Sequence, residues 1–129
     1  MSQPQHYSPY DGPLWESIAK DEMRLQRCEA CGTFRYPPGP CCPKCLSLEY
    51  RWEIVGGRGR VLSWTTFHRQ YLPSYPPPHS VVAVALEEGP IMIADVSRED
   101  AERLALDAEV RLTYVDHPEG YRRPQFKLC

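Results

Sequence analysis

The sequence predicts a mainly β protein in which a short N-terminal helix and a four-cysteine metal-binding ribbon precede a small closed barrel. Three observations support this fold class. Apolar residues recur at helical spacing between positions 12 and 20, two Cys-x-x-Cys pairs lie between positions 28 and 45, and period-two alternation dominates beyond position 50. These patterns follow one another without overlap, so each part of the chain indicates its own kind of structure.

The composition is that of an ordinary globular protein. The chain has 129 residues, of which 42% are hydrophobic and 25% charged, which suffices for one domain with a real core. No apolar run reaches the roughly 18 residues of a membrane span, and the first residues lack the basic and apolar regions of a signal peptide. We therefore expect a cytoplasmic protein.

The first element is a short helix over Gly12 to Lys20, with Pro13 suited to the first helical position. Its apolar stripe consists of Leu14, Trp15, Ile18 and Ala19. This stripe either packs on the chain's own body or docks on another protein, since so short a helix is marginal without tertiary support. Under the second interpretation, Trp15 is a candidate partner contact.

The second part contains the pairs Cys28/Cys31 and Cys42/Cys45, which ten residues separate. In a reducing compartment such spacing indicates metal binding before disulfides. Each two-residue gap lets a tight turn aim two thiolates at one ion, and Gly32 relieves the first turn. Zinc is the expected metal, and iron in a rubredoxin-like site is the alternative. Four thiolates leave no open coordination position, so the site is structural.

Two cysteines are left over. Cys42 suits the two-residue spacing better than Cys41, which we expect to lie beside the site as a small side chain. Cys129 ends the chain without a neighbouring motif, and we expect it to be an exposed thiol.

The third part is rich in β-branched and aromatic residues. Strands are predicted at 52–55, 60–68, 80–86, 91–96, 110–115 and 124–128. Residues 56–59 interrupt the first two as a turn or bulge, 87–90 form a hairpin, and Ser97 opens a helical turn through Leu104. Five or six short strands with one small helix favour a five-stranded oligonucleotide/oligosaccharide-binding (OB) barrel. We expect a helical segment at 1–26, a rubredoxin-like zinc ribbon at 27–50 and an OB-fold domain at 51–129.

The segment from Tyr71 to Pro78 cannot continue a strand, because four of its eight residues are prolines. Its stiffness lowers the entropy cost of binding, so Tyr71 and Tyr75 are candidate contacts for a partner or ligand. A rigid connector is the alternative interpretation.

No catalytic constellation is found. The chain lacks Walker A, GxGxxG, GxSxG and HExxH motifs. His68 and His79 flank the proline-rich loop and could meet, but without a nucleophile nearby a structural role is expected. Residues 56–60 could cradle a phosphate through open amides and the guanidinium groups of Arg58 and Arg60, although a glycine-rich turn explains the same residues.

The order of helix, two Cys-x-x-Cys turns (knuckles) and barrel resembles the zinc-ribbon/OB-fold proteins first catalogued as domain of unknown function 35. The resemblance covers essentially the whole chain. It is carried by Leu14-Trp15, Cys28-x-x-Cys31-Gly32, Tyr36-Pro37-Pro38, Cys42-Pro43-x-Cys45 and Gly59-Arg60-Val61-Leu62-Ser63-Trp64-Thr65. Knuckles alone are shared with many ribbons, and the Pro-Pro between them, the tryptophan helix and the Gly-x-Val strand make the match specific.

The resemblance implies a non-catalytic accessory subunit for acyl-CoA enzymes. Members pair with thiolase-like proteins, including thiolases, acyltransferases, hydroxymethylglutaryl-CoA synthase and lipid-transfer-protein-like aldolases that shorten steroid side chains. Such a subunit stabilises its partner in a hetero-oligomer and helps hold the acyl-CoA, while the catalytic residues belong to the partner. It also implies zinc ligation by Cys28, Cys31, Cys42 and Cys45, with Cys41 a departure from a pattern that needs no fifth cysteine.

Two other functions remain open. Zinc ribbons and OB barrels often bind single-stranded nucleic acid, but a net charge of −2 and a pI near 6.1 argue against a polyanion partner. Residues 51–69 hold four arginines and one glutamate, whereas 87–119 hold ten acidic residues and three arginines. A free-standing acyl-CoA hydrolase or transferase lacks a nucleophile–base pair in this sequence.

Overall fold

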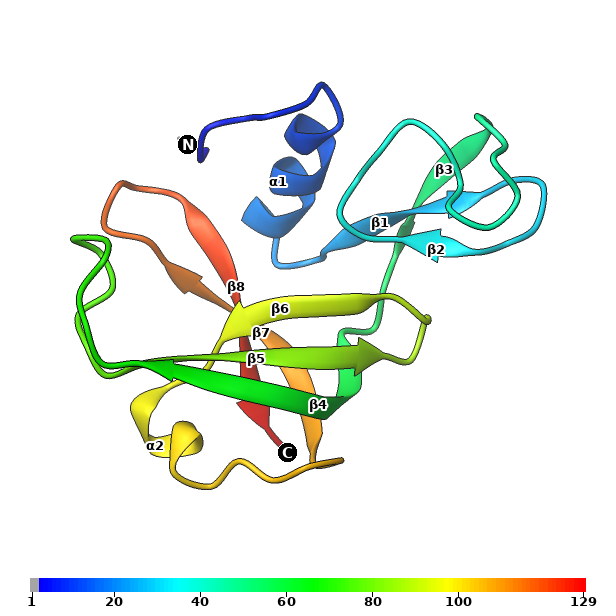
Figure 1. Ribbon diagram of the computed structural model, residues 1–129. Helices are drawn as coiled ribbons and strands as arrows, with labels where there is room; N and C mark the ends of the chain where they lie inside the picture. Colours follow the sequence, from blue (N-terminus) through cyan, green and yellow to red (C-terminus); the bar gives the residue numbers. More distant parts are fainter. Residues whose placement is uncertain (1–2) are drawn as a thin grey trace.

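The computed structural model describes residues 3–129 and contains two β-sheets and two short helices (Figure 1). A three-stranded sheet has the order β2-β1-β3, and a five-stranded sheet has the order β6-β5-β4-β7-β8. The elements are α1 (Asp11–Ala19), β1 (Arg24–Cys28), β2 (Phe34–Arg35), β3 (Tyr50–Ile54), β4 (Arg58–Phe67), β5 (His79–Leu86), β6 (Ile91–Asp95), α2 (Arg98–Ala101), β7 (Glu109–Asp116) and β8 (Arg122–Leu128). Within 3–129, neither helix has the length and apolarity needed to cross a bilayer.

The five-stranded sheet curls into a nearly closed barrel. Strand β4 is ten residues long and pairs with β5 over most of its length and with β7 at its start. A bulge between Val61 and Ser63 bends β4, and a parallel bridge from Val96 to Phe126 joins the end of β6 to β8. The mainly β class and the OB barrel predicted from the pattern are thus confirmed.

One hydrophobic core runs through the molecule. Alternate residues of β5 point inward, as a half-buried strand requires. The buried cluster contains Leu14, Ile18, Met23, Leu25, Val55, Val61, Val82, Val84, Leu86, Met92, Val96, Val110 and Phe126. Because its members come from α1, β1 and the barrel alike, the ribbon and barrel share apolar packing.

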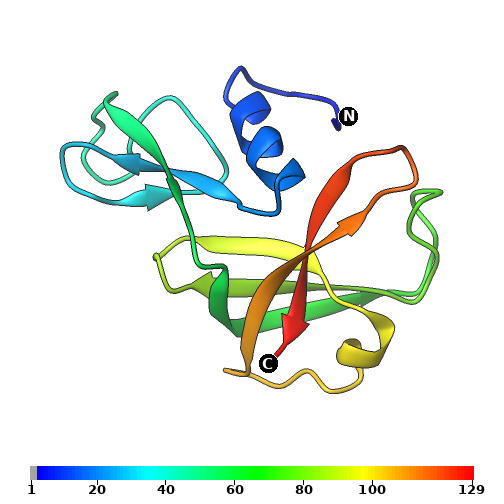
Figure 2. The ribbon, with the colours of Figure 1, turned by 180° about the vertical axis from the view of Figure 1, so that it is seen from behind.

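Helix α1 packs on the chain's own body, between the ribbon and β8 (Figures 1 and 2). Leu14 and Ile18 are buried, and the Trp15 ring meets Tyr121 edge to face at 5.8 Å. The helix begins at Asp11, so Pro13 is its third residue and not its first. The first turn still tolerates this proline, because its missing N–H has no partner within the helix.

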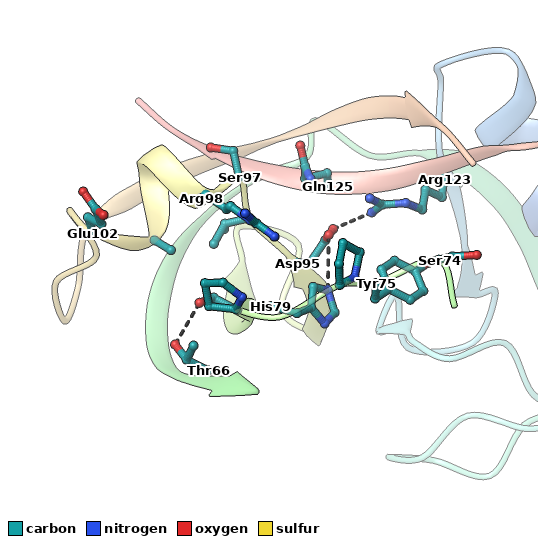
Figure 3. Close-up of a pocket in the computed structure, with 15 residues that line it drawn as sticks. Thr66, Ser74, Tyr75, His79, Asp95, Ser97, Arg98, Glu102, Arg123 and Gln125 are labelled. Carbon is teal, nitrogen blue, oxygen red and sulfur yellow. Dashed lines mark hydrogen bonds and ion pairs between the residues drawn. The ribbon is translucent and has the colours of Figure 1, made fainter. Parts of the chain in front are cut away.

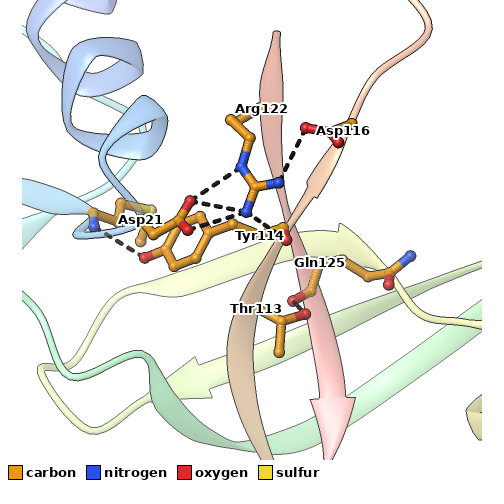
Figure 4. Close-up of polar contacts among 7 residues, drawn as sticks. Asp21, Thr113, Tyr114, Asp116, Arg122 and Gln125 are labelled. Atoms are coloured by element: carbon orange, nitrogen blue, oxygen red, sulfur yellow. Dashed lines mark hydrogen bonds and ion pairs between the residues drawn. The ribbon is translucent and has the colours of Figure 1, made fainter.

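A network around Arg122 fastens the turn after α1 to the end of the β7–β8 hairpin (Figure 4). Its guanidinium donates to the carboxylates of Asp21 and Asp116 at 3.0 Å and to the carbonyl oxygen of Tyr114 at 3.0 Å. The Tyr114 hydroxyl in turn accepts the Met23 amide at 2.9 Å. The carboxylates of Asp116 and Asp21 raise the pKa of Arg122, so this connection stays charged.

Three strands differ from the prediction. Strands β1 and β2 were not predicted, and the strand expected near 52–55 forms β3, which pairs with β1 in the ribbon sheet and not in the barrel. The chain leaves β3 at Val55, and residues 56–57 turn it into β4. A Cβ on Gly59 would lie 2.5 Å from the Ala85 oxygen, so strand packing itself demands glycine there.

Candidate functional site

The two cysteine knuckles have the same backbone geometry. In each, the amide of the first cysteine donates to the carbonyl five residues later at 2.9 Å, and its carbonyl accepts the amide four residues later at 3.0 Å. The fifth residue of each turn is left-handed, with φ of 77° at Gly32 and 65° at Leu46. Cys28 and Cys42 are therefore equivalent, and each sits at the start of its own loop.

This equivalence fixes the register of the second knuckle. Cys42 is fully buried, and the amides of Lys44 and Cys45 point at its sulfur at 3.4 and 3.5 Å. Cys41 lies outside the sulfur cluster, at the wall of a neighbouring cavity, and Cys129 is an exposed thiol. The expectations for these two surplus cysteines agree with their positions.

The four sulfurs fit a single tetrahedral metal ion. The Sγ atoms of Cys28, Cys31, Cys42 and Cys45 all lie within 4.8 Å of one another. Two of the edges, Cys28–Cys45 and Cys31–Cys42, measure 3.6 Å. A zinc ion with bonds of about 2.3 Å to each thiolate requires edges of about 3.8 Å, which these two edges approach.

Ionisation of the cluster also favours a cation. The Thr33 hydroxyl and amide hold the pKa of Cys31 at about 6. The Ser47 amide lowers the pKa of Cys45, but the neighbouring side chains of Cys28 and Cys31 outweigh this effect and the pKa is raised to about 12. Four thiolates so close together ionise jointly only around a dication, which zinc supplies.

Residues 56–60 comprise the turn at 56–57 and the start of β4, and two of their polar groups are engaged. The Gly56 amide donates to the Glu88 carboxylate at 2.9 Å, and Arg60 pairs with Glu109 at 3.1 Å. These contacts occupy part of the phosphate cradle that the sequence allowed. Arg58 is exposed on β4.

Tyr75, which we expected from the sequence to be a possible contact for a partner or ligand, anchors the proline-rich loop to the barrel. Its ring stacks on His79 at 4.8 Å and lies under the Arg123 guanidinium at 5.3 Å. Asp95, buried beneath, pairs with Arg123 at 2.5 Å and with His79 at 3.4 Å (Figure 3). Burial raises the pKa of Tyr75. His79 thus meets Asp95, while His68 is exposed.

A cavity of about 420 Å³ opens beside these rings, between the proline-rich loop and α2. Two hydroxyls in its wall, those of Thr66 and Ser80, bond to each other at 2.8 Å. Asp95 and Arg123 were missed in the sequence, because single charged residues at strand ends form no pattern until β6 and β8 are brought together.

The outer face of strands β5 and β6 is rich in apolar residues, whereas the neighbouring residues of β4 include the exposed Ser63 and Thr65. Ile91 and Ile93 are 56% and 62% exposed and lie opposite Ala85 and Ala83 of β5. At the other end of the same face stand Phe67 and Tyr71, the latter 69% exposed. We call the surface formed by Phe67, Tyr71, Leu72, Val81, Ala83, Ala85, Ile91 and Ile93 the outer barrel face. The uninterrupted apolar run of β6 was the signal for it, because such runs indicate a strand covered on both sides.

Comparisons with known proteins agree with this architecture. The family model described as "ChsH2, rubredoxin-like zinc ribbon domain" matches residues 15–51, and "ChsH2, C-terminal OB-fold domain" matches residues 52–115. A "DUF35 domain-containing scaffold protein" of Pyrococcus furiosus is 30% identical over 117 residues, which cover 87% of this chain and 80% of that protein. The chain belongs to the DUF35 family. Its zinc ribbon, and zinc as the metal, are confirmed as the sequence predicted.

Two longer relatives carry hydratase names. The "3-oxo-4,17-pregnadiene-20-carboxyl-CoA hydratase alpha subunit" of Mycobacterium tuberculosis is 33% identical over 106 residues, 82% of this chain and 34% of that protein. The "Probable enoyl-CoA hydratase alpha subunit" of Thermomonospora curvata is 30% identical over 118 residues, 91% of this chain and 37% of that protein. This DUF35 chain therefore spans about a third of the length of either relative.

A solved structure matches nearly the whole DUF35 chain. It is a chain of the "Ltp2-ChsH2(DUF35) aldolase", with a TM-score of 0.85 and 27% sequence identity over 96% of this chain and 98% of that one. Helix, ribbon and barrel thus have the same relative arrangement in both proteins.

Proposed function

We propose that this protein is a non-catalytic accessory subunit of an acyl-CoA enzyme complex. It binds and stabilises a thiolase-like or lipid-transfer-protein-like partner, such as a thiolase, an acyltransferase or a steroid side-chain aldolase, and helps hold the acyl-CoA substrate. The observation that carries the proposal is the full-length likeness to the DUF35 chain of an aldolase complex. The catalytic residues are those of the partner.

The metal site supports a structural role. Cys28, Cys31, Cys42 and Cys45 would hold zinc with all four positions filled, so neither water nor substrate reaches it. Zinc bound there would supply folding free energy, and the four cysteines of this chain would hold the ion.

The outer barrel face is the surface we assign to the partner. Exposed apolar residues gathered on one face mark interaction sites, and Ile91 and Ile93 stand on an edge strand with one side unpaired in the five-stranded sheet. Of the contact residues expected from the sequence, Tyr71 and Arg58 are exposed and keep that assignment. Trp15, Tyr75 and Arg60 are engaged within the chain and are at most peripheral contacts.

Co-expression with a thiolase-like or lipid-transfer-protein-like protein encoded nearby tests the proposal. We expect one complex on gel filtration and higher acyl-CoA turnover for the complex than for the partner alone. Two separately eluting proteins, with the partner fully active alone, would refute it.

A matched pair of variants tests the assigned face. Ile93→Lys places a charge on the outer barrel face and should abolish co-elution, because burying an unpaired ammonium group is costly. Leu106→Lys changes a residue that is also exposed, on the segment after α2, and should co-elute normally. If the two variants co-elute with the partner to the same extent, the partner does not bind this face.

Single-stranded nucleic acid is the second candidate, because Phe67 and Tyr71 stand at the β4–β5 loop, where OB folds stack bases. The charges argue against it. Arg51 pairs with Glu29 at 3.3 Å and Arg60 with Glu109 at 3.1 Å, so part of the arginine-rich stretch is neutralised. Salt-sensitive binding of a short single-stranded oligonucleotide would favour this candidate over the first.

A further inference from the structure

Strand β3 leaves one of its two edges unpaired. The ribbon sheet has the order β2-β1-β3, so β3 pairs with β1 on one side and has no strand neighbour on the other within residues 3–129. Figure 2 shows β3 along the outside of the ribbon, with no other segment drawn over it. An open edge is a template for pairing with another chain, so proteins usually shield it.

The two edges of the ribbon sheet differ. Strand β2, at the far edge, has only two residues, and Pro37 and Pro38 follow it closely and cannot extend a ladder. Strand β3 has five residues, reads Tyr-Arg-Trp-Glu-Ile without proline or lysine, and pairs with β1 in unbroken register. Its last residue, Ile54, is 51% exposed. The β3 edge is therefore long and regular enough to accept a further strand.

The hydrogen bonds of the ribbon show which backbone groups of β3 point outward. Just beyond the strand, the Val55 amide donates to the Met23 carbonyl oxygen at 3.1 Å. Because hydrogen-bonded and non-hydrogen-bonded pairs alternate along an antiparallel ladder, the odd-numbered residues of β3 bond to β1. Three amides and three carbonyls therefore point away from β1, those of Tyr50, Trp52 and Ile54.

The strand also carries opposite charges on one face of the ribbon. Arg51 and Glu53 are two residues apart, and their side chains are 44% and 35% exposed. Across β1, Arg51 lies directly opposite a like charge, Arg27. Its ion pairs with Glu29 and Glu53 are 3.3 and 3.6 Å long. Like charges opposite each other destabilise a sheet, so a further carboxylate on the open side of Arg51 is favourable.

This strand is complementary to itself. When a second copy pairs antiparallel about Trp52, this residue meets Trp52 of the other copy and Tyr50 meets Ile54, so every outward amide and carbonyl gains a partner. The same register places Arg51 opposite Glu53 of the other copy, twice by symmetry. A shift of one residue sets outward groups opposite inward ones. A shift of two residues sets Arg51 or Glu53 opposite its own copy.

We propose that this protein forms a homodimer through β3, in which two three-stranded ribbons join into one antiparallel sheet. The occupant of the open edge is a second copy of the chain, and the register is centred on Trp52. The interface uses none of the residues of the outer barrel face, so each copy keeps that face free for a different partner. Failure of the dimer would leave the proposed accessory function untouched.

Sedimentation equilibrium of the zinc-loaded protein between about 5 μM and about 1 mM tests the proposal. We expect a reversible monomer–dimer equilibrium with a Kd of about 100 μM or lower. Arg51→Glu sets like charges opposite each other at both ends of the interface and should weaken the dimer at least about tenfold. Arg111→Glu makes the same change at an exposed position of β7 and should dimerise as the parent does. A parent chain that stays monomeric at about 1 mM, or equal weakening by both variants, would overturn the proposal.

A charge swap tests the register. The double variant Arg51→Glu/Glu53→Arg keeps the net charge and again places opposite charges across the interface, so its Kd should be within about threefold of the parent's. A double variant that dimerises no better than Arg51→Glu would contradict the register. Ile93→Lys, on the outer barrel face, should leave the dimer intact. Loss of the dimer in Ile93→Lys would place the contact on the barrel and refute the proposal.

Amide hydrogen exchange gives a measurement on the unmodified chain, in case a charge variant does not fold. The outward amides of Tyr50, Trp52 and Ile54 should exchange more slowly at about 1 mM than at about 50 μM, as followed by nuclear magnetic resonance. The amides of Arg51 and Glu53 already bond to β1 and should change less. Outward amides that exchange at the same rate at both concentrations would contradict pairing at this edge.

Discussion

Replacing Gly32 by alanine should weaken zinc binding about fivefold, whereas replacing Leu46 by glycine should leave it nearly unchanged. Both residues occupy the left-handed position of their knuckle, with φ of 77° and 65°. A side chain there costs about 1–2 kcal/mol, and alanine recovers about 0.4–1 kcal/mol through the unfolded chain. An added Cβ on Gly32 lies 3.7 Å from Arg27, so no clash adds to this. The net cost of the substitution is about 1 kcal/mol. Because folding of the knuckle and binding of the metal are one reaction, this cost lowers the zinc affinity about fivefold.

For Leu46 the same effects nearly cancel. Glycine relieves about 1–2 kcal/mol of strain but gives back about 0.4–1 kcal/mol in chain entropy. Leu46 is 72% exposed, so loss of its remaining burial costs about 0.5 kcal/mol. The net change is within about 0.5 kcal/mol.

Competition for zinc against a chromophoric chelator measures both variants. Gly39→Ala is the control, because a Cβ at Gly39 would meet nothing within 4 Å. Parental zinc affinity in Gly32→Ala, or an equal loss in both knuckle variants, would refute this account of the turns.

Three further predictions concern stability. Gly59→Ala should cost about 2 kcal/mol, because its Cβ would meet the backbone of β5 at 2.5 Å, and a urea midpoint shift no larger than that of Gly39→Ala would contradict this. Burial raises the pKa of Asp100, but the Leu128 amide and the Arg103 guanidinium lower it more, so the pKa is below its ordinary value. The Asp100 carboxylate therefore stabilises the fold fully above about pH 4, and this stabilisation is lost as the pH falls through the lowered pKa. Asp100→Asn should lower the free energy of unfolding by about 1 kcal/mol at pH 7. The difference between variant and parent should decrease in acid, and a difference that does not depend on pH would contradict stabilisation by the ionised carboxylate. Removal of zinc by a chelator should lower the urea midpoint of the barrel as well as the ribbon, as followed by tryptophan fluorescence, and an unchanged barrel transition would show two independent units.

The cysteine ligands could be predicted from the sequence because their chemistry is local. Two residues between paired thiolates and a glycine after the first pair specify a knuckle without knowledge of the rest of the chain. Barrel strands β5 and β6 were also predictable, because residues 81–86 and 91–94 form short apolar runs, the first of them rich in valine, on either side of a Gly-Pro turn.

Ribbon strands could not be predicted in this way. Strand β2 has two residues, and β1 reads Arg-Leu-Gln-Arg-Cys, in which the polar Gln26 occupies a buried position. Gln26 is buried against Gly39 of the ribbon loop, and Arg35 is buried against Tyr50 of β3. These contacts are long-range, and so is the meeting of Asp95 with Arg123. Sequence patterns predict helices and strands because their apolar residues recur at a fixed period. Contacts between single residues far apart in the chain have no such period and could not be predicted.

The shared core explains how a closed metal site can serve an accessory subunit. Met23 and Leu25, which lead into the ribbon, are buried in the same cluster as Val82 and Phe126 of the barrel. The Met23 amide also donates to the Tyr114 hydroxyl on β7. Zinc binding therefore orders a segment that packs in the same core as the barrel strands, so free energy gained at the cysteines also stabilises the barrel. The shared core can in this way stay ordered while the outer barrel face, which we propose as the partner's binding surface, remains exposed to solvent.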